Sequence, residues 1–247
     1  IIYLVISAVF IGCTPILSID ASTQSVYHFS DTDKNISLLD ISETFGTYDG
    51  SFVLYDNNLD SWKIYDLEEA TKRIPPDGDA FPFPSWEADQ DLNSAMQNSV
   101  NWYFQAIDSQ LGINRVQEFL NKIEYGNQTT SSNLDLYWSD FSLKISPLEQ
   151  VTLLKKFNTN EFHLNSQNVF SVKNAIKIAS TPNGNFYGKT GTGRVNGQDI
   201  NGWFIGYVET SDNSYYFATN IQSDSNATGK KAFEITSDIL KKLHIWN

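Results

Sequence analysis

The chain begins with an apolar stretch that has no polar face. Residues 1–17 are apolar except at five positions, and residues 18–22 are mostly small and polar. An apolar run followed by small residues is typical of a signal peptide and its cleavage zone, so we expect residues 1–24 to be removed on export. Such a peptide also has a Met and a basic region before the run, and we expect the sequence to start a few residues late. The alternative is a buried strand or helix.

Two hairpins are predicted in the rest of the chain, one near each end. Residues 47–55 and 61–65 form strand-like segments around a polar turn, as do residues 202–209 and 215–221. Apolar residues at helical spacing occur between the hairpins and after the second one, at residues 91–107, 114–123, 147–157, 169–178 and 229–243. This order predicts an α+β fold: an antiparallel sheet flanked by helices, with a helical subdomain.

Composition and charge narrow the class of protein. With 247 residues, 40% of them hydrophobic, the chain can bury one large core, and we expect a single domain over residues 25–247. The net charge of −12 argues against a nucleic-acid partner, because binding to a polyanion is driven by basic residues. Cys13 is the only cysteine, which excludes an intrachain disulfide. The stretch Phe10-Ile11-Gly12-Cys13 weakly resembles a lipoprotein acylation site, and a small apolar role for Cys13 is the alternative.

The histidines predict no metal site. His28, His163 and His244 are isolated, and neither a His-Glu-x-x-His motif nor a cluster of carboxylates at ligand spacing occurs in the sequence. We expect these histidines to lie on the surface or to pack against neighbours. No metal and no cofactor are predicted.

The stretch Gly188-Lys189-Thr190-Gly191-Thr192-Gly193 precedes the second hairpin and has two interpretations. A phosphate-binding loop needs a Gly five residues before Gly188 and a helix afterwards. Asn183 occupies that position, and the turn Val195-Asn196-Gly197 leads into a strand-like segment instead. The phosphate-binding interpretation is therefore excluded.

The same stretch resembles the Lys-Thr-Gly motif of penicillin-binding proteins and serine β-lactamases, which lies on an edge strand beside the active site. In such a site the Lys189 ammonium and the Thr190 hydroxyl can hold a substrate carboxylate. Gly191 lets a ligand lie close to the strand, and we include Thr192 among the substrate-binding residues. Alone, three such residues more commonly form a turn with an exposed lysine.

A second motif stands where that family has a Ser-x-Asn on a loop facing the strand. Ser99-Val100-Asn101 precedes Lys189 in the expected order. The Ser99 hydroxyl would relay a proton to a leaving amine, and the Asn101 amide would bind a substrate carbonyl. The alternative is that both are ordinary polar positions of a helix.

Further motifs make the resemblance specific to class D β-lactamases. Tyr125-Gly126-Asn127 matches their Tyr-Gly-Asn element, Tyr137-Trp138 with residues 143–146 matches their omega-loop region, and residues 202–206 match the strand after Lys-Thr-Gly. The same stretches resemble the extracellular sensor domains of penicillin-responsive membrane receptors. The resemblance implies that Trp138 would bind beside substrate and shield a catalytic lysine, which becomes carbamylated in that family.

The chain departs from the family at the nucleophile. The family places a Ser-x-x-Lys at the start of a buried helix after Pro-Pro-Asp. Here Pro75-Pro76-Asp77 runs directly into Gly78, and no serine of the chain has a lysine three residues later. Two threonines do, Thr152 and Thr228, and we interpret them as a mid-helix position and a helix cap. We therefore predict a deletion between Asp77 and Gly78 that removes the nucleophile, the base and one oxyanion amide.

Three functions remain open. The first is a class D β-lactamase whose intact form hydrolyses penicillins through an acyl-serine, with the present chain inactive. The second is a penicillin-binding sensor module that becomes acylated without turnover, and the third is a non-catalytic remnant that at most binds the antibiotic. In each, β-lactams are the expected partner. We expect the protein to be extracytoplasmic, secreted or loosely membrane-anchored, with membrane contact only through the signal segment.

Overall fold

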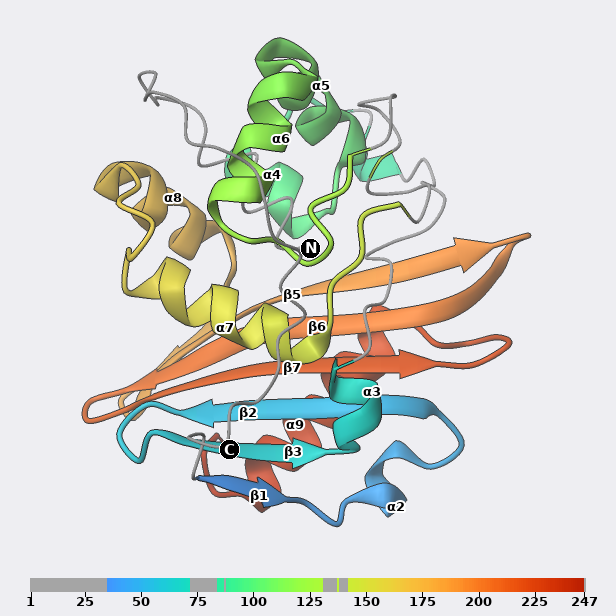
Figure 1. The fold of residues 1–247 in the computed structure, drawn as a ribbon, viewed down its shortest axis with the longest axis vertical. Helices are drawn as coiled ribbons and strands as arrows, with labels where there is room; N and C mark the ends of the chain where they lie inside the picture. Colours follow the sequence, from blue (N-terminus) through green and yellow to red (C-terminus); the bar gives the residue numbers. More distant parts are fainter. Residues whose placement is uncertain (1–34, 72–83, 87, 131–136, 138–141, 247) are drawn as a thin grey trace.

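A seven-stranded sheet runs through the centre of the molecule (Figure 1). The computed structural model describes residues 35–71, 84–86, 88–130, 137 and 142–246. The predicted signal segment, Cys13, His28, the junction between Asp77 and Gly78, and Trp138 lie outside these residues. Within the described ranges, no helix is long and apolar enough to span a bilayer.

The sheet confirms both predicted hairpins. Its strands are β1 (Ile36–Leu38), β2 (Asp49–Asp56), β3 (Ser61–Tyr65), β4 (Lys177–Thr181), β5 (Gly184–Val195), β6 (Gln198–Thr210) and β7 (Ser214–Gln222). Their order is β1-β3-β2-β7-β6-β5-β4. The expectation of a purely antiparallel sheet is wrong at one edge, because β1 pairs with β3 in parallel. The short β1 arrives from outside both hairpins, so no hairpin turn imposes an antiparallel direction on it.

Helices cover both faces of the sheet. They are α2 (Ser42–Phe45), α3 (Leu67–Thr71), α4 (Leu92–Gln97), α5 (Asn101–Leu111), α6 (Ile113–Lys122), α7 (Pro147–Asn158), α8 (Ser166–Ala175) and α9 (Gly229–Lys242), with a 3-10 turn at Pro84–Trp86. Helix α9 packs on β5, β6 and β7 from one side, and α7 packs on β2, β6 and β7 from the other. Helices α4, α5, α6 and α8 form the predicted helical region beyond α7 (Figure 1).

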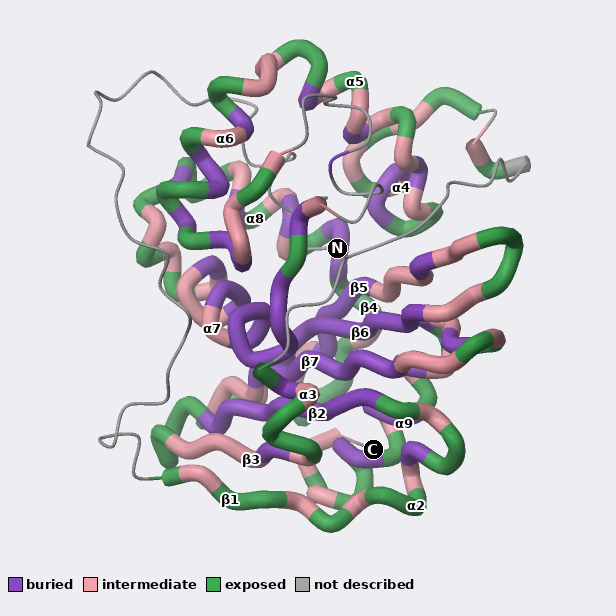
Figure 2. The backbone as a smooth tube through the Cα atoms, turned by 45° about the vertical axis from the view of Figure 1, so that its right-hand side comes forward, coloured by how far each residue is buried: buried purple, intermediate pink, exposed green. Residues whose placement is uncertain are grey.

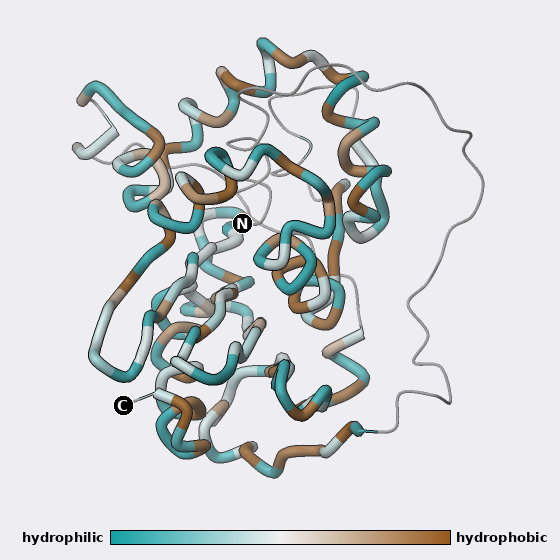
Figure 3. Tube along the Cα trace, turned by 90° about the vertical axis from the view of Figure 1, so that its left-hand side faces the viewer, coloured by the Kyte–Doolittle hydropathy of each residue, from teal (hydrophilic) through white to brown (hydrophobic). Residues whose placement is uncertain are grey.

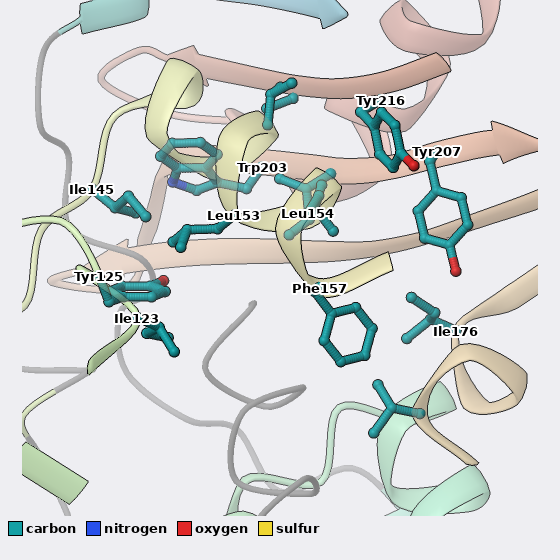
Figure 4. Packing of buried hydrophobic residues seen from close by; sticks show 14 of the residues in the cluster. Ile123, Tyr125, Ile145, Leu153, Leu154, Phe157, Ile176, Trp203, Tyr207 and Tyr216 are labelled. Atoms are coloured by element: carbon teal, nitrogen blue, oxygen red, sulfur yellow. The ribbon is translucent and has the colours of Figure 1, made fainter. Parts of the chain in front are cut away.

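Alternation along the strands separates two hydrophobic cores. Phe186, Phe204 and Phe217 belong to the cluster under α9, whereas their neighbours Tyr187, Ile205 and Ala218 belong to the cluster under α7. Successive side chains of a strand point to opposite faces, so both faces of these strands are apolar and buried. Figure 2 shows the resulting buried centre of the sheet, and Figure 4 shows Leu153, Leu154 and Phe157 of α7 within the second cluster.

Helix α7 is strongly determined by local sequence. Its N-cap Ser146 accepts from the Glu149 backbone N–H while the Glu149 carboxylate accepts from the Ser146 N–H, a capping box, and Pro147 occupies the first turn. Apolar residues recur at helical spacing along the helices, and hydrophobic and hydrophilic residues therefore alternate along the trace in Figure 3.

The interpretation of Thr152 as a mid-helix position is confirmed, since its hydroxyl donates to the Leu148 carbonyl inside α7 at 3.1 Å. That of Thr228 is also confirmed, because its side chain caps α9.

Two predicted helices have the wrong extent. The helix expected over residues 91–107 is two helices, α4 and α5, separated at Ser99. The one expected over residues 169–178 ends at Ala175, and the chain continues directly into the edge strand β4. In both cases apolar residues keep helical spacing across the break, so the pattern alone does not reveal it.

Candidate active site

Lys189 and Ser99 are brought together at the junction of the sheet and the helical region. The Lys189 Nζ donates to the Ser99 Oγ at 2.5 Å, although the residues are 90 positions apart. The ammonium also donates to the Thr190 carbonyl oxygen at 2.7 Å. Lys189 is 7% exposed, so its charge is poorly screened by solvent and acts strongly on whatever lies beside it. The structure thus places the two predicted catalytic residues in one site.

The backbone at Ser99 explains how a helical sequence presents this hydroxyl. The Val100 N–H donates to the Ala95 carbonyl at 2.9 Å and the Ser99 N–H donates to the Met96 carbonyl at 3.3 Å. These two bonds define a Schellman motif, in which the residue after the cap adopts a left-handed conformation. Ser99 has φ 53°, in a position where glycine is usual. The next residue, Val100, is buried and is the N-cap of α5.

Lys189 lies just beyond the point where the pairing of β5 with β4 ends. Strand β4 pairs with β5 from Gly184 to Tyr187, and the Gly188 N–H donates to the Ile176 carbonyl at 2.9 Å. From Lys189 onward, β6 is the one strand paired with β5 in the described part of the chain. The expectation of an edge strand is therefore correct for Lys-Thr-Gly itself, but β4 is the edge of the sheet as a whole.

Thr190, Gly191 and Thr192 lie close to α9 or to the residues packed under it. Thr190 is paired with Phe204, a residue of the cluster under α9, so its side chain shares that face. The Thr192 Oγ1 accepts from the Gly229 N–H at 2.9 Å, and Gly191 lies against Gly229 at the start of α9. Their assignment to substrate binding stays a prediction. What the structure adds is that the N-terminus of α9 holds this part of β5 in place.

Asn101 lies close to Ser99 along the chain, whereas the Tyr-Gly-Asn element contacts the segment before α7. Asn101 begins α5, two residues after Ser99. Gly126 has φ 50° and lies so close to the Lys144 carbonyl that a Cβ there would be 1.9 Å from the oxygen. The Asn127 side chain accepts from the Lys144 N–H at 2.9 Å and donates to the Ser142 carbonyl at 2.7 Å. The element therefore joins the helical region to the segment that leads into α7.

Several buried polar atoms lie in or beside the cluster under α7, and the sequence motifs predicted no role for them. Tyr125 is fully buried, and its hydroxyl accepts from the Gln150 Nε2 at 3.5 Å. The Trp203 Nε1 and the Gln150 Oε1 are buried and have no hydrogen-bond partner among the described residues. Figure 4 shows Trp203 and Tyr125 in the cluster under α7. Their burial was predictable from the apolar pattern, but their missing partners were not.

Two tyrosines on the α7 face of the sheet, Tyr187 and Tyr207, have raised pKa values. Burial, followed by the negative charge of Glu209 and a hydrogen bond to it, raises the pKa of Tyr187 to about 12. Burial is also the main cause of the raised pKa of Tyr207. Both hydroxyls therefore stay protonated near neutral pH, and neither can act as a base.

The histidines lie on the surface where the structure describes them: His163 and His244 are exposed. The described ranges contain no group of three potential metal ligands.

Comparison with known proteins identifies the family. Residues 62–241 match the family model described as penicillin binding protein transpeptidase domain, and the chain belongs to this family. It is 39% identical to the regulatory protein BlaR1 of Bacillus licheniformis, over 98% of the chain and 45% of the relative. It is 33% identical to the probable beta-lactamase YbxI of Bacillus subtilis, over 84% of the chain and 86% of the relative.

Solved structures give the same result for the fold. The C-terminal domain of the Bacillus licheniformis BlaR penicillin-receptor superposes with a TM-score of 0.81 at 39% identity, covering 86% of this chain and 98% of that one. The predicted α+β class and the resemblance to class D β-lactamases and penicillin sensors are confirmed. The chain spans about half the length of the regulatory proteins it matches.

Proposed function

We propose that this chain is a β-lactam-recognising domain of the penicillin-receptor type and that, in its present form, it binds the antibiotic without forming a covalent bond. The observation that carries the proposal is the contact between the Lys189 Nζ and the Ser99 Oγ. An ammonium group only donates hydrogen bonds, so Ser99 accepts here and its own hydroxyl proton stays available. A carboxylate can therefore interact with the Lys189 charge and accept from Ser99.

The kind of relative favours a receptor over a hydrolase. The chain matches proteins named as regulatory or as a penicillin receptor at 36% to 39% identity. The class D enzymes OXA-48 and OXA-10 match at 31% and 33% over 67% and 61% of the chain. By analogy with the receptor, the domain would meet the antibiotic outside the cytoplasm, and the apolar run at residues 1–17 would support export.

The missing nucleophile explains why we propose reversible binding. No Ser-x-x-Lys is present in the chain, and acylation requires a hydroxyl within reach of a base. The alignment with BlaR1 of Bacillus licheniformis runs over 272 positions, whereas the whole chain has 247 residues. That relative therefore has residues without a counterpart here, which supports the proposed deletion between Asp77 and Gly78.

The partnerless Trp203 Nε1 and Gln150 Oε1 also support a missing segment. A buried polar atom that lacks a partner costs roughly 1–3 kcal/mol. A further helix packed beside the cluster under α7 would offer partners for both atoms. The catalytic lysine of the family, and its carbamylation, would belong to that helix.

Calorimetry with benzylpenicillin tests the binding proposal. We expect measurable binding by the unmodified chain, weakened about tenfold or more in Lys189→Ala because a charge-assisted bond to the carboxylate is lost. Lys230→Ala is the matched control, since Lys230 is exposed on α9, and it should bind as the unmodified chain does. Binding that does not change in Lys189→Ala, or no binding at all, would contradict the proposal.

A class D hydrolase is the second candidate for the form that contains the nucleophile. The chain covers 86% of the probable beta-lactamase YbxI of Bacillus subtilis at 33% identity, so most of the length of that relative has a counterpart here. Turnover of a chromogenic cephalosporin by a chain with the helix restored separates the two candidates. A hydrolase would release product continuously, and a receptor would stop after one equivalent.

A further inference from the structure

The first turn of α5 carries an exposed tryptophan beside the site. Trp102 is 42% exposed and follows Ser99 by three residues, which limits the separation of their Cα atoms to about 11 Å. The described part of the chain has few other large hydrophobic side chains so exposed, and Phe170 on α8 is the other aromatic one. Of these two, only Trp102 adjoins a predicted site residue.

A hydrogen bond to Trp86, which is itself anchored to Asn98, holds the indole of Trp102 in place. Its Nε1 donates to the Trp86 carbonyl at 3.0 Å, and the Trp86 Nε1 donates to the Asn98 carbonyl at 3.0 Å. Asn98 is the residue before Ser99, so the same turn that presents the Ser99 hydroxyl also anchors the two tryptophans. Tyr103 lies edge-on to Trp102 with ring centroids 6.3 Å apart. A ring fixed in this way loses little conformational entropy when a ligand stacks on it.

The exposure of Trp102 has a cause in the helix itself. The buried side of α5 consists of Phe104 and Asp108, four residues apart, in line with buried Val100 at its N-cap. Trp102 lies two residues from this row and so points away from it. An apolar ring that is fixed but left open to solvent costs free energy, and a ligand that covers it recovers that cost.

We infer that Trp102 forms one wall of a subsite that holds an aromatic group on the acyl side chain of a β-lactam. The inference rests on the proposed function, because it requires the ligand carboxylate to lie at Lys189 and Ser99. A penicillin carries its acylamino group on the opposite side of the fused rings from its carboxylate. With the carboxylate held at the Lys189 end, the acyl group extends along the start of α5, where the indole face is available for stacking.

The test compares two penicillins of equal charge, benzylpenicillin and one with a straight-chain alkyl acyl group. Their affinities are measured by calorimetry or by saturation-transfer NMR on the unmodified chain and on variants. Trp102→Ala should lower the affinity ratio of benzyl to alkyl penicillin by about twofold to tenfold, the usual contribution of an aromatic pair beyond its buried area. Trp102→Phe should largely keep the ratio. Phe170→Ala is the matched control and should leave it unchanged.

Each outcome separates this subsite from the proposed function. Lys189→Ala should weaken both penicillins and preserve their ratio. If it does so while Trp102→Ala leaves the ratio unchanged, the subsite is wrong and the proposed function stands. If Phe170→Ala changes the ratio as much as Trp102→Ala does, the effect is nonspecific and the subsite is again wrong. If the unmodified chain binds neither penicillin, the proposed function is wrong and the subsite is wrong with it. Circular dichroism checks that each variant is folded.

Discussion

Gly229, the first residue of α9, lies directly against Gly191 of the Lys-Thr-Gly stretch. A Cβ at Gly229 would be 2.5 Å from the Gly191 carbonyl oxygen and 2.8 Å from its nitrogen. Backbone atoms cannot turn aside as a flexible side chain can. The helix on one face of the sheet therefore sets the position of the strand that presents Lys189 on the other.

We predict that Gly229→Ala lowers the free energy of unfolding by about 1–3 kcal/mol, the usual cost of overpacking. Alanine is otherwise better than glycine in a helix, so a loss must come from the contact with Gly191. Urea unfolding measures it, and penicillin affinity should fall as β5 shifts. Lys230→Ala, at the exposed next position, serves as the control. A Gly229→Ala protein as stable as the unmodified one would show that α9 can move without disturbing β5.

Two substitutions at Ser99 separate backbone strain from the lost hydroxyl. Ser99→Ala keeps a side chain at φ 53° and removes the Lys189 partner, whereas Ser99→Gly removes the strain as well. The left-handed conformation costs a residue with a Cβ about 1 kcal/mol, so Ser99→Gly should be more stable than Ser99→Ala by that amount in urea unfolding. Both should bind benzylpenicillin more weakly than the unmodified chain. Equal stability of the two variants would mean that the Schellman turn relaxes around residue 99.

Alkaline pH should destabilise the protein through Tyr187. Its pKa rises from 10.0 to about 12 on folding, mainly by burial and then through Glu209. The unfolded chain therefore releases this proton at lower pH than the folded one, so the stability present below pH 10 is lost as pH rises toward about 12. Tyr187→Phe should show a shallower loss of unfolding free energy across that window. Urea unfolding at several pH values measures the free energy of unfolding. If its dependence on pH is the same in Tyr187→Phe as in the unmodified chain, the effect comes from Tyr207 and Tyr216 instead.

Restoring the nucleophile tests the proposed deletion. The chain should show no covalent mass increase with a penicillin, because Ser99 has no lysine three or four residues away to act as a base. Inserting a class D type Ser-x-x-Lys helix between Asp77 and Gly78 should restore acylation, detected by mass spectrometry. It should also raise the thermal midpoint, since the helix would fill space in the core. Acylation of the unmodified chain would point to an unrecognised nucleophile, and a folded insertion variant that is not acylated would contradict the assigned site.

The order of elements and the family followed from the sequence by itself. Two apolar segments separated by a short polar turn predicted β6 and β7. The Lys-Thr-Gly, Ser-x-Asn and Tyr-Gly-Asn motifs indicated the family because they resemble its motifs and occur in the same order along the chain. The absence of Ser-x-x-Lys is likewise a property of the sequence alone.

The tertiary structure decided where one helix ends and the next begins, and which distant residues come into contact. Met96, Val100 and Phe104 are buried at helical spacing, so the apolar pattern continues across Ser99, and only the backbone reveals the turn there. Alternation assigns Lys189 to one face of β5 but does not say which helix covers that face. Its contact with Ser99, 90 residues away, depends on how α4, α5 and the sheet pack together. Such packing is set by many distant side chains at once, and no local pattern encodes it.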